Sequence, residues 1–429
     1  MQKRVLIIDD EPGILSTLSG ILGDEGYETL TTGSGEEALA IYRDSQPEVV
    51  FLDIWLPDMD GLETLGAILE IDPGAAVVMM SGHAATSTAV KAIKMGALDY
   101  MEKPLSYGQA VEGAAAALEY RESMSSSFGA LREPGRRRRP EIVPPPSLPQ
   151  LAVSERPQKT IRENIVIYGL GLHSGTRTGM AIQPLPPDSG IHFQTMPNNR
   201  VIPAHVGMVA DTDYATTLSS GGDEIRTVEH FLSALHALGV TNLLIKVHGE
   251  IPVLDGSALE FCNTLEEIGV SEQEAARREV VVDRRYEVGG GNGKLLTLEP
   301  YDGFKVSYRL KYPPPVGEQA FGFELTDFES YKRDVAPART FGFMRDLAMM
   351  NELGLGSGGR LDNCILVGED DVINTELRFP DEFARHKVLD VIGDLYLLGY
   401  PIRGQVEARF TGHRDNIEIL RRLAAGAAD

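Results

Sequence analysis

Short apolar runs alternate with stretches of helical periodicity over the first part of the chain. The apolar runs predict five strands, at residues 4–8, 28–31, 49–53, 76–80 and 99–101. Helical spacing of apolar residues follows these runs, as at 14–22 and 35–44. Strands that alternate with helices predict a parallel sheet covered on both faces, with functional groups at the C-terminal strand ends.

A change of composition interrupts this pattern. Residues 124–158 are rich in Ser, Pro, Gly and Arg and include PGRRRRPEIVPPPSLP, which predicts an extended, semi-rigid linker. Beyond the linker, residues 159–429 mix strands and helices without regular alternation. Two long helices are predicted there, at 227–238 and 380–398. The chain is therefore expected to contain two domains, 1–123 and 159–429.

Composition narrows the classes of function. The 429 residues carry a formal net charge of −23, which argues against general nucleic-acid affinity because polyanions are bound by basic faces. The basic cluster Arg136 to Arg139 is interpreted as a solvated tether, with a phosphate or anionic-lipid contact as the alternative. Two cysteines, no long apolar stretch and no signal-peptide pattern predict a cytoplasmic chain without membrane insertion.

Acidic side chains gather where the predicted strands of the first domain end. Asp9 and Asp10 follow the first strand and Asp53 ends the third, a set of carboxylates suited to Mg²⁺. Ser81 follows the fourth strand, where a hydroxyl could bind a phosphoryl oxygen, and Lys103 follows the fifth. The alternative is that each acid only caps the start of a helix.

The motifs IIDDEP, DIWLPDMDGLE, MMSGHA and YMEKP, in this order, resemble the response-regulator receiver domain over about residues 1–122. The resemblance implies a flavodoxin-like (βα)5 fold in which Asp53 accepts a phosphoryl group from a sensor histidine kinase. It also implies that Asp9 and Asp10 organise Mg²⁺ together with Asp53. The residues implied to sense or transmit phosphorylation are Ser81, Lys103 and Tyr100.

Two helical motifs of the second domain carry candidate metal ligands. TVEH places Glu229 beside His230, and EFARHKVLD places His386 and Asp390 four residues apart, on one helix face. Two imidazoles and one carboxylate leave a fourth tetrahedral position open, as in catalytic zinc sites. Alternatively, each histidine is an ordinary core or surface residue, since the sequence does not show that the two helices meet.

Six ordered blocks extend these motifs over about residues 159–422. They are YGLGLHSG, TVEHFLSALHALGVTN, EIPVLDGSA, ARTFGFMRD, EFARHKVLDVIGDLYLLG and TGHRDN. Together they resemble the UDP-3-O-acyl-N-acetylglucosamine deacetylases, which catalyse the committed step of lipid A synthesis. The resemblance implies an α+β fold of two similar halves, about 159–283 and 284–429, packed around a zinc ion.

The resemblance also implies roles for individual residues. The implied zinc ligands are His230, His386 and Asp390, and Glu229 is the implied general base. His413 would protonate the leaving amine, Asp394 would orient His413, and Thr340 would hydrogen-bond the oxyanion. The side chains implied to contact the sugar and its acyl chain are Lys387 and Phe341. His173 in GLHSG is expected only to form a structural turn.

The receiver departs from the usual deacetylase pattern, and its purpose stays open. Phosphorylation of Asp53 could change deacetylase activity, the receiver could localise or dimerise the enzyme, or it could be an inert relic of fusion. The alternative to an enzyme is a two-component signalling protein whose second domain senses a UDP-sugar without catalysis. No DNA-reading element follows the receiver, so a transcription factor is disfavoured.

Overall fold

The computed structural model describes residues 3–81, 91–93, 95–103, 107–132, 142–196, 198–291 and 293–426. The chain divides into two compact units, Met1–Gly135 and Arg136–Asp429. The cluster Arg136 to Arg139 lies outside the described residues. No helix in the described part of the chain is both long and apolar enough to cross a membrane.

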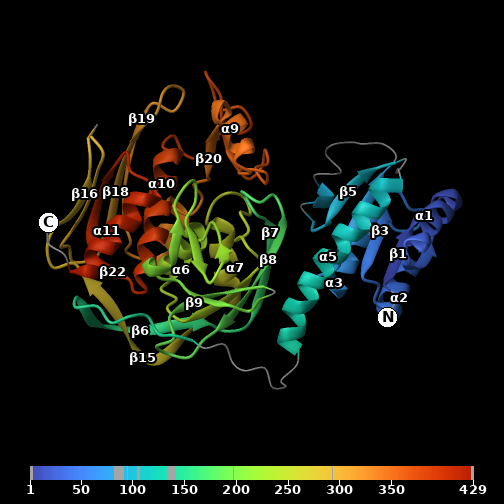
Figure 1. Ribbon diagram of the computed structural model, residues 1–429, viewed down its shortest axis with the longest axis horizontal. Coiled ribbons are helices and arrows are strands. Elements are labelled where there is room, and N and C mark those ends of the chain that lie inside the picture. The colour runs from blue at the N-terminus through green and yellow to red at the C-terminus, as the bar shows by residue number, and fades with distance from the viewer. Residues whose placement is uncertain are drawn as a thin grey trace. The chain divides into compact units, whose positions relative to one another are not determined.

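The first unit contains a five-stranded parallel sheet in the order β2-β1-β3-β4-β5 (Figure 1). Its strands are β1 (Arg4–Ile8), β2 (Glu28–Thr32), β3 (Val49–Asp53), β4 (Val77–Ser81) and β5 (Asp99–Glu102). They match the five predicted strands to within one residue at each end, and the predicted fold class is confirmed. Asp53 and Ser81 end neighbouring strands, so both lie at the same edge of the sheet.

Helices cover both faces of this sheet because successive strand side chains point to opposite faces. Val5 and Ile7 pack in the core that α1 (Pro12–Asp24) and α5 (Tyr107–Arg132) cover. Leu6 and Ile8 face the opposite core, under α2 (Gly35–Ser45) and α3 (Gly61–Ile71).

The expected linker of residues 124–158 is shorter in the structure. Helix α5 continues to Arg132 and ends shortly before Pro134, because proline cannot continue a helix and disfavours helical geometry in the residue before it. Strand β6 (Leu151–Ile161) begins before the expected boundary and pairs antiparallel with β15 (Val270–Val281). It is an edge strand, and Pro157 lies at an irregularity of the pairing, so a proline is tolerated there.

Residues just before β6 already pack on the second unit. Leu148 is 9% exposed and belongs to the core of that unit. The carbonyl oxygen of Pro145 accepts a hydrogen bond of 3.1 Å from the hydroxyl of Tyr400. This part of the expected linker is therefore a docked segment. Its composition predicted a solvent-exposed chain, but tertiary contacts hold it against the second unit.

The second unit is built from two halves with the same strand topology. The first-half strands are β7 (Ile165–Leu170), β8 (Arg177–Pro184), β9 (Ile191–Thr195), β10 (Val201–Pro203) and β14 (Leu243–Val247). The second-half strands are β16 (Tyr286–Gly289), β17 (Leu295–Glu299), β18 (Phe304–Lys311), β19 (Glu318–Glu324) and β22 (Ile402–Arg409). The orders β7-β8-β14-β9-β10 and β16-β17-β22-β18-β19 correspond strand by strand, including the single parallel pair in each. The predicted pair of similar halves is confirmed.

The expected boundary at residue 283 needs one correction. Strand β15 precedes that boundary, yet it pairs with β22 of the second-half sheet as well as with β6. The long β6–β15 ribbon runs along one side of the unit in Figure 1. The hydrogen bonding of the sheets therefore assigns β15 to the second half, although β15 precedes residue 283 in the chain.

Two helices from each half complete this unit. They are α6 (Glu229–Leu238), α7 (Leu259–Ile268), α10 (Glu382–Leu395) and α11 (His413–Ala425). Helix α10 packs against α6, and a β-carbon built on Gly393 would lie 1.9 Å from the carbonyl oxygen of Glu229. A glycine at position 393 thus permits the close approach of the two helices.

Smaller elements decorate the two halves. A three-stranded sheet is formed by β11 (Val209–Asp211), β12 (Thr217–Ser220) and β13 (Asp223–Ile225). Another segment contains β20 (Phe341–Phe343), α9 (Leu347–Glu352) and β21 (Ile365–Val367). The remaining helices are α8 (Phe328–Asp334) and the 3-10 turns η1 (Val206–Met208), η2 (Met344–Asp346) and η3 (Tyr396–Leu398).

Candidate functional site

The predicted zinc ligands converge between α6 and α10. One donor atom from each of His230, His386 and Asp390 lies within 4.8 Å of the others, and all three side chains are buried. Oδ1 of Asp390 lies 3.7 Å from Nε2 of His230 and 3.5 Å from Nε2 of His386. The three donors come from two helices that are distant in sequence, and the packing of the halves brings them together.

The chemistry of these donors fits a zinc ion. Burial lowers the pKa of His230 to about 3 and holds the pKa of His386 below its usual value, so both imidazoles are neutral. Burial opposes ionisation of Asp390, but the positive charges of Lys387 and of the protonated His413 hold its pKa below the usual carboxyl range. Nδ1 of His386 lies 3.1 Å from the carbonyl oxygen of Ala338. A carbonyl oxygen can only accept, so Nδ1 carries the proton and Nε2 keeps its lone pair for a metal.

Glu229 precedes a proposed ligand and lies at the start of α6. Its side chain is 2% exposed, and its Oε2 accepts a hydrogen bond of 3.2 Å from the backbone N–H of Thr216. Burial raises the pKa of Glu229 to about 8. A carboxylate whose pKa is raised toward neutral pH is a stronger base than an ordinary carboxylate, and its deprotonated form is suited to general base catalysis.

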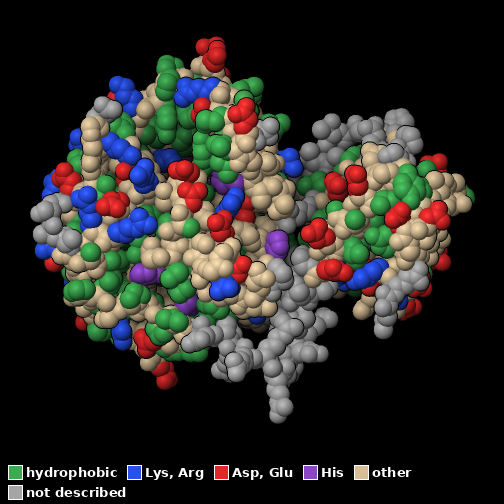
Figure 2. Space-filling model, viewed as in Figure 1, with side chains coloured by type: hydrophobic (Ala, Val, Ile, Leu, Met, Phe, Trp, Pro, Cys, Tyr) green, Lys and Arg blue, Asp and Glu red, His purple; other side chains and the backbone are tan. Residues whose placement is uncertain are grey.

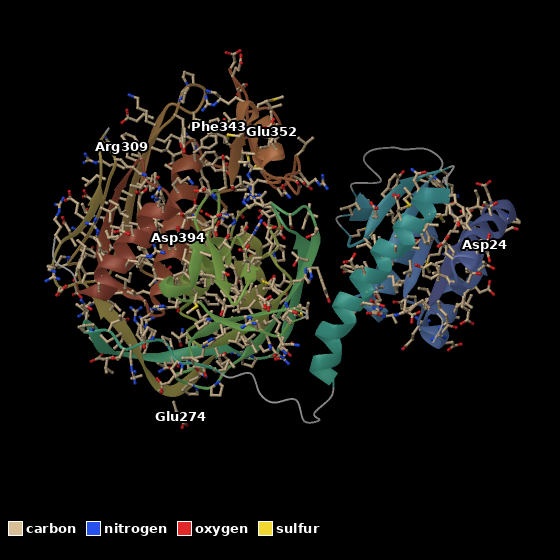
Figure 3. The ribbon with its side chains drawn as sticks, viewed as in Figure 1. Asp24, Glu274, Arg309, Phe343, Glu352 and Asp394 are labelled. Carbon is tan, nitrogen blue, oxygen red and sulfur yellow. The ribbon has the colours of Figure 1, made fainter. Side chains whose placement is uncertain are left out.

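His413 and Asp394 form a buried pair beside the metal cluster. Nδ1 of His413 lies 2.7 Å from Oδ2 of Asp394, and Nε2 of His413 lies 4.0 Å from Asp390. Asp394 also accepts hydrogen bonds from Thr216 Oγ1 at 2.6 Å and from Asn416 Nδ2 at 2.8 Å. Figure 3 shows Asp394 in the interior of the unit. The carboxylate is thus held in place by two residues of α11 and by Thr216, which lies directly before β12.

Three further predicted residues line this region. Nζ of Lys387 lies 3.0 Å from Oδ2 of Asp390 and 5.5 Å from the ring centroid of Phe341. The Phe341 ring lies 6.1 Å from the imidazole of His386. Thr340 is half-buried, and its backbone N–H donates to the carbonyl oxygen of Gly256 at 2.7 Å. All three therefore belong to the region around α10 and β20.

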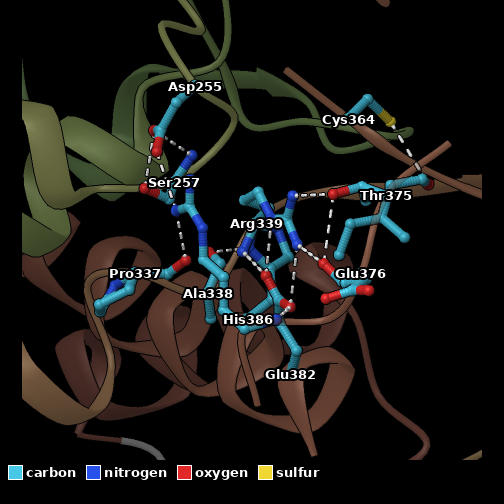
Figure 4. Close-up of polar contacts among 12 residues, drawn as sticks. Asp255, Ser257, Pro337, Ala338, Arg339, Cys364, Thr375, Glu376, Glu382 and His386 are labelled. Atoms are coloured by element: carbon cyan, nitrogen blue, oxygen red, sulfur yellow. Dashed lines mark hydrogen bonds and ion pairs between the residues drawn. The ribbon is translucent and has the colours of Figure 1, made fainter. Parts of the chain in front are cut away.

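A buried ion pair that the sequence analysis did not single out holds this region together. Nε of Arg339 lies 2.9 Å from Oε1 of Glu382, and the backbone N–H of Arg339 donates to the same oxygen at 3.1 Å (Figure 4). Glu382 lies four residues before His386 on α10, so one helix holds both Arg339 and the carbonyl of Ala338. The motifs ARTFGFMRD and EFARHKVLDVIGDLYLLG contain Arg339 and Glu382, but no sequence spacing indicates that these two residues pair.

His173 lies in the GLHSG turn, where a structural role was expected. The turn is closed by a hydrogen bond of 3.1 Å from the N–H of Gly175 to the carbonyl of Gly171. The side chain of His173 is 3% exposed, and neither ring nitrogen has a partner among the described residues. Its ring interacts electrostatically with Glu250 and His413. The turn therefore borders the site.

The first unit carries its own candidate metal centre. Carboxylate oxygens of Asp9, Asp10 and Asp53 lie within 4.8 Å of one another. Nζ of Lys103 lies 2.6 Å from Asp9 Oδ2 and 2.9 Å from Asp53 Oδ2. Burial raises the pKa of Asp53, although its hydrogen bond with Lys103 opposes that shift. Ser81 is 1% exposed at the adjacent strand end, so the predicted cluster is assembled.

The predicted switch residue Tyr100 lies on β5 of this unit. Its hydroxyl is buried and has no hydrogen-bond partner among the residues that the structure describes.

The visible face of the unit in Figure 2 carries conspicuous groups of acidic side chains. These acids agree with a cation-binding surface rather than one for polyanions.

Comparison with known proteins covers both units. The model of the UDP-3-O-acyl N-acetylglycosamine deacetylase family matches residues 158–425, and that of the response regulator receiver domain matches residues 5–114.

Curated relatives share the name UDP-3-O-acyl-N-acetylglucosamine deacetylase. The protein of Anaeromyxobacter sp. (strain Fw109-5) is 44% identical over 271 residues, which cover 62% of this chain and 88% of that protein. The protein of Thermodesulfovibrio yellowstonii is 40% identical over 268 residues, which cover 62% of this chain and 91% of that protein.

Among solved structures, the receiver domain of NtrX from Brucella abortus is 45% identical, with a TM-score of 0.26. The match covers 27% of this chain and 98% of that one. Both resemblances drawn from the sequence are confirmed by the family matches. The first unit is a response-regulator receiver domain, and the chain belongs to the UDP-3-O-acyl N-acetylglycosamine deacetylase family.

Proposed function

We propose that the second unit hydrolyses the acetamide of UDP-3-O-acyl-N-acetylglucosamine, releasing acetate and a free amine, and so takes part in lipid A biosynthesis. The observation that carries this proposal is the meeting of His230, His386 and Asp390 beside a buried Glu229 and His413. Family membership supports the same substrate.

The proposed zinc ligands are His230, His386 and Asp390. A zinc ion held there would polarise the substrate carbonyl and lower the pKa of a water molecule to about 7. Glu229 accepts the proton of the attacking water, as its buried position and raised pKa suit a base. The backbone N–H of Thr216 orients the Glu229 carboxylate during this step.

His413 is the proposed acid for the departing amine. Burial favours its neutral form, but the charge and hydrogen bond of Asp394 raise the pKa of His413 to about 9. The imidazole therefore carries a proton at neutral pH. Asp394 orients the ring and is itself held by Thr216 and Asn416. Proton donation matters because an amine anion is a very poor leaving group.

The remaining proposed contacts bind the substrate. The Thr340 hydroxyl donates to the developing oxyanion, a contact worth about 10²–10³-fold in rate. Lys387 contacts the sugar, and the Phe341 ring contacts the acyl chain beside Phe383, whose ring centroid lies 4.9 Å away. The aromatic surface next to His386 thus receives the apolar part of the substrate.

The receiver is proposed to regulate this activity through Asp53. Asp9, Asp10 and Asp53 bind Mg²⁺, and Asp53 takes a phosphoryl group from a sensor histidine kinase. Ser81 and Lys103 bind the phosphoryl oxygens, and Tyr100 transmits the change. The proximity of Lys103 to both buried acids supports this assignment.

Acetate release by the purified full chain tests the proposal. The chain should release acetate from UDP-3-O-acyl-N-acetylglucosamine, lose this activity with a chelator and regain it with zinc. A non-catalytic UDP-sugar sensor is the competing function. It would bind the substrate and leave the acetamide intact at full zinc occupancy, and that outcome would reject the enzyme assignment.

A further inference from the structure

Glu250 is a buried carboxylate that joins two segments beside the proposed zinc site. Its side chain is 2% exposed. Oε1 accepts hydrogen bonds of 2.9 Å from the backbone N–H of His173 and from the hydroxyl of Thr227, and Oε2 accepts one of 2.9 Å from the N–H of Ser174. One side chain thus links the GLHSG turn to the residue that lies two positions before Glu229.

Thr227 has a backbone conformation that threonine rarely adopts. Its φ of 60° lies in the left-handed region, which is unfavourable for a β-branched residue. Such a conformation persists only when the surroundings hold it. Thr227 is 2% exposed, and its hydroxyl contacts Glu250, while the backbone of Arg226 bonds to that of Gly249 and Ile251. The strained residue therefore fixes the direction in which the chain enters α6.

Helix α6 begins with Glu229, and His230 follows directly. A change at Thr227 would rotate this first turn, which carries both the proposed base and one proposed zinc ligand. We infer that Glu250 is a positioning residue of the zinc site, acting through Thr227 on Glu229 and His230 and through the GLHSG turn on His173. This inference rests on the proposed function for its kinetic part, whereas its metal-binding part stands on the geometry alone.

The surroundings of Glu250 support a positioning role. Among the described residues, no Lys or Arg nitrogen forms an ion pair with this carboxylate, so hydrogen-bond donors alone offset its desolvation. A β-carbon built on Gly171 would lie 2.3 Å from its Oε2. The turn therefore approaches the carboxylate as closely as glycine permits. A glutamine could accept through one oxygen only and would leave an amide group facing an N–H donor.

Thr178 offers a matched control. Its hydroxyl is also buried and also bonds to residue 250, but to the backbone carbonyl of Glu250, at 3.0 Å, and to that of His248. Thr178→Val therefore removes a comparable buried hydrogen bond without touching the carboxylate. Thr227→Val removes the hydroxyl that Glu250 holds, and Thr227→Ser keeps it.

The test measures the metal and the reaction separately in the full chain. Co²⁺ is the probe for metal binding. Thr227→Val and Glu250→Gln should raise its dissociation constant by about tenfold and alter its visible spectrum, because the loss of a residue that positions a metal ligand weakens metal binding. With zinc saturating, both variants should lower kcat by about 10–100-fold with a smaller change in KM, because the base is displaced. Thr227→Ser and Thr178→Val should match the wild type in both measurements.

Both substitutions disturb the hydrogen bond between Thr227 and Glu250, so the double variant Thr227→Val with Glu250→Gln should be no worse than the more affected single variant. A Co²⁺ spectrum and dissociation constant within twofold of wild type in folded Thr227→Val and Glu250→Gln would overturn the inference. Equal effects in Thr178→Val would also overturn it, since stability alone would then explain them. A wild type that binds metal but releases no acetate would reject the proposed function instead, and the Co²⁺ results would still decide the role of Glu250.

Discussion

Nδ1 of His413 lies 2.7 Å from Oδ2 of Asp394, and both side chains are at most 9% exposed. Burial would favour the neutral imidazole, but the nearby carboxylate raises the pKa of His413 to about 9. The pair thus keeps a proton available beside the metal cluster at neutral pH.

This pair predicts the alkaline side of the pH–rate profile. Turnover should fall as the pH rises through about 9, because His413 then loses the proton that the leaving amine needs. His413→Ala should lower kcat by about 10²-fold or more and remove this limb. The control is His205→Ala, since among the described residues that ring has one hydrogen bond, which it accepts from the backbone N–H of Gly207. An unchanged limb in His413→Ala would exclude His413 as the acid.

Glu229 should be required for turnover but not for zinc. Glu229→Gln keeps the side-chain shape and an oxygen for the N–H of Thr216, but it cannot accept a proton. We expect one zinc per chain and a kcat lowered by about 10²–10⁴-fold, measured by metal analysis and acetate release. Glu274→Gln, at an exposed position of β15, should change neither. Loss of zinc from Glu229→Gln would assign Glu229 a structural role.

The close contact of α6 and α10 predicts a strong effect of one methyl group. Gly393→Ala would place a β-carbon 1.9 Å from the carbonyl oxygen of Glu229, so the helices must separate. The expected loss of stability is about 1–3 kcal/mol, with weaker zinc binding, measured by thermal unfolding and metal titration. The control is Gly20→Ala in α1, whose added β-carbon would have no atom within 4 Å, so the stability should be unchanged or higher. Full zinc affinity in Gly393→Ala would show that the contact tolerates separation.

The receiver should couple to the enzyme through Asp53. Treatment of the full chain with an acyl-phosphate donor should phosphorylate Asp53 and change kcat/KM by about 5–150-fold, the usual range of coupling between two sites. Asp53→Asn should block both effects. Identical kinetics before and after phosphorylation would leave localisation, dimerisation or an inert relic as the role of the receiver.

The docked segment before β6 should contribute to the stability of the second unit. Leu148→Ala removes a side chain that is 9% exposed in the core and should cost about 2–5 kcal/mol of unfolding free energy. Val143→Ala, at a side chain that is 56% exposed, should cost little. Equal melting temperatures for the two variants would show that residues 142–150 are not part of the folded unit.

The amino-acid sequence by itself determined the receiver fold and the identity of most candidate chemical groups. Its five apolar runs are short, separated and followed by helical spacing, so local pattern was enough to predict β1 to β5. The motifs TVEH and EFARHKVLD likewise contain the three residues of the metal cluster.

Only the tertiary structure decided which of these groups meet. His230 and His386 are far apart in the chain, and their rings lie 4.9 Å apart because two halves pack through α6 and α10. The Glu250 contact with Thr227 and the docking of Leu148 have the same origin. Pattern and spacing report on neighbours within one element, whereas contacts between elements depend on the packing of whole sheets and helices.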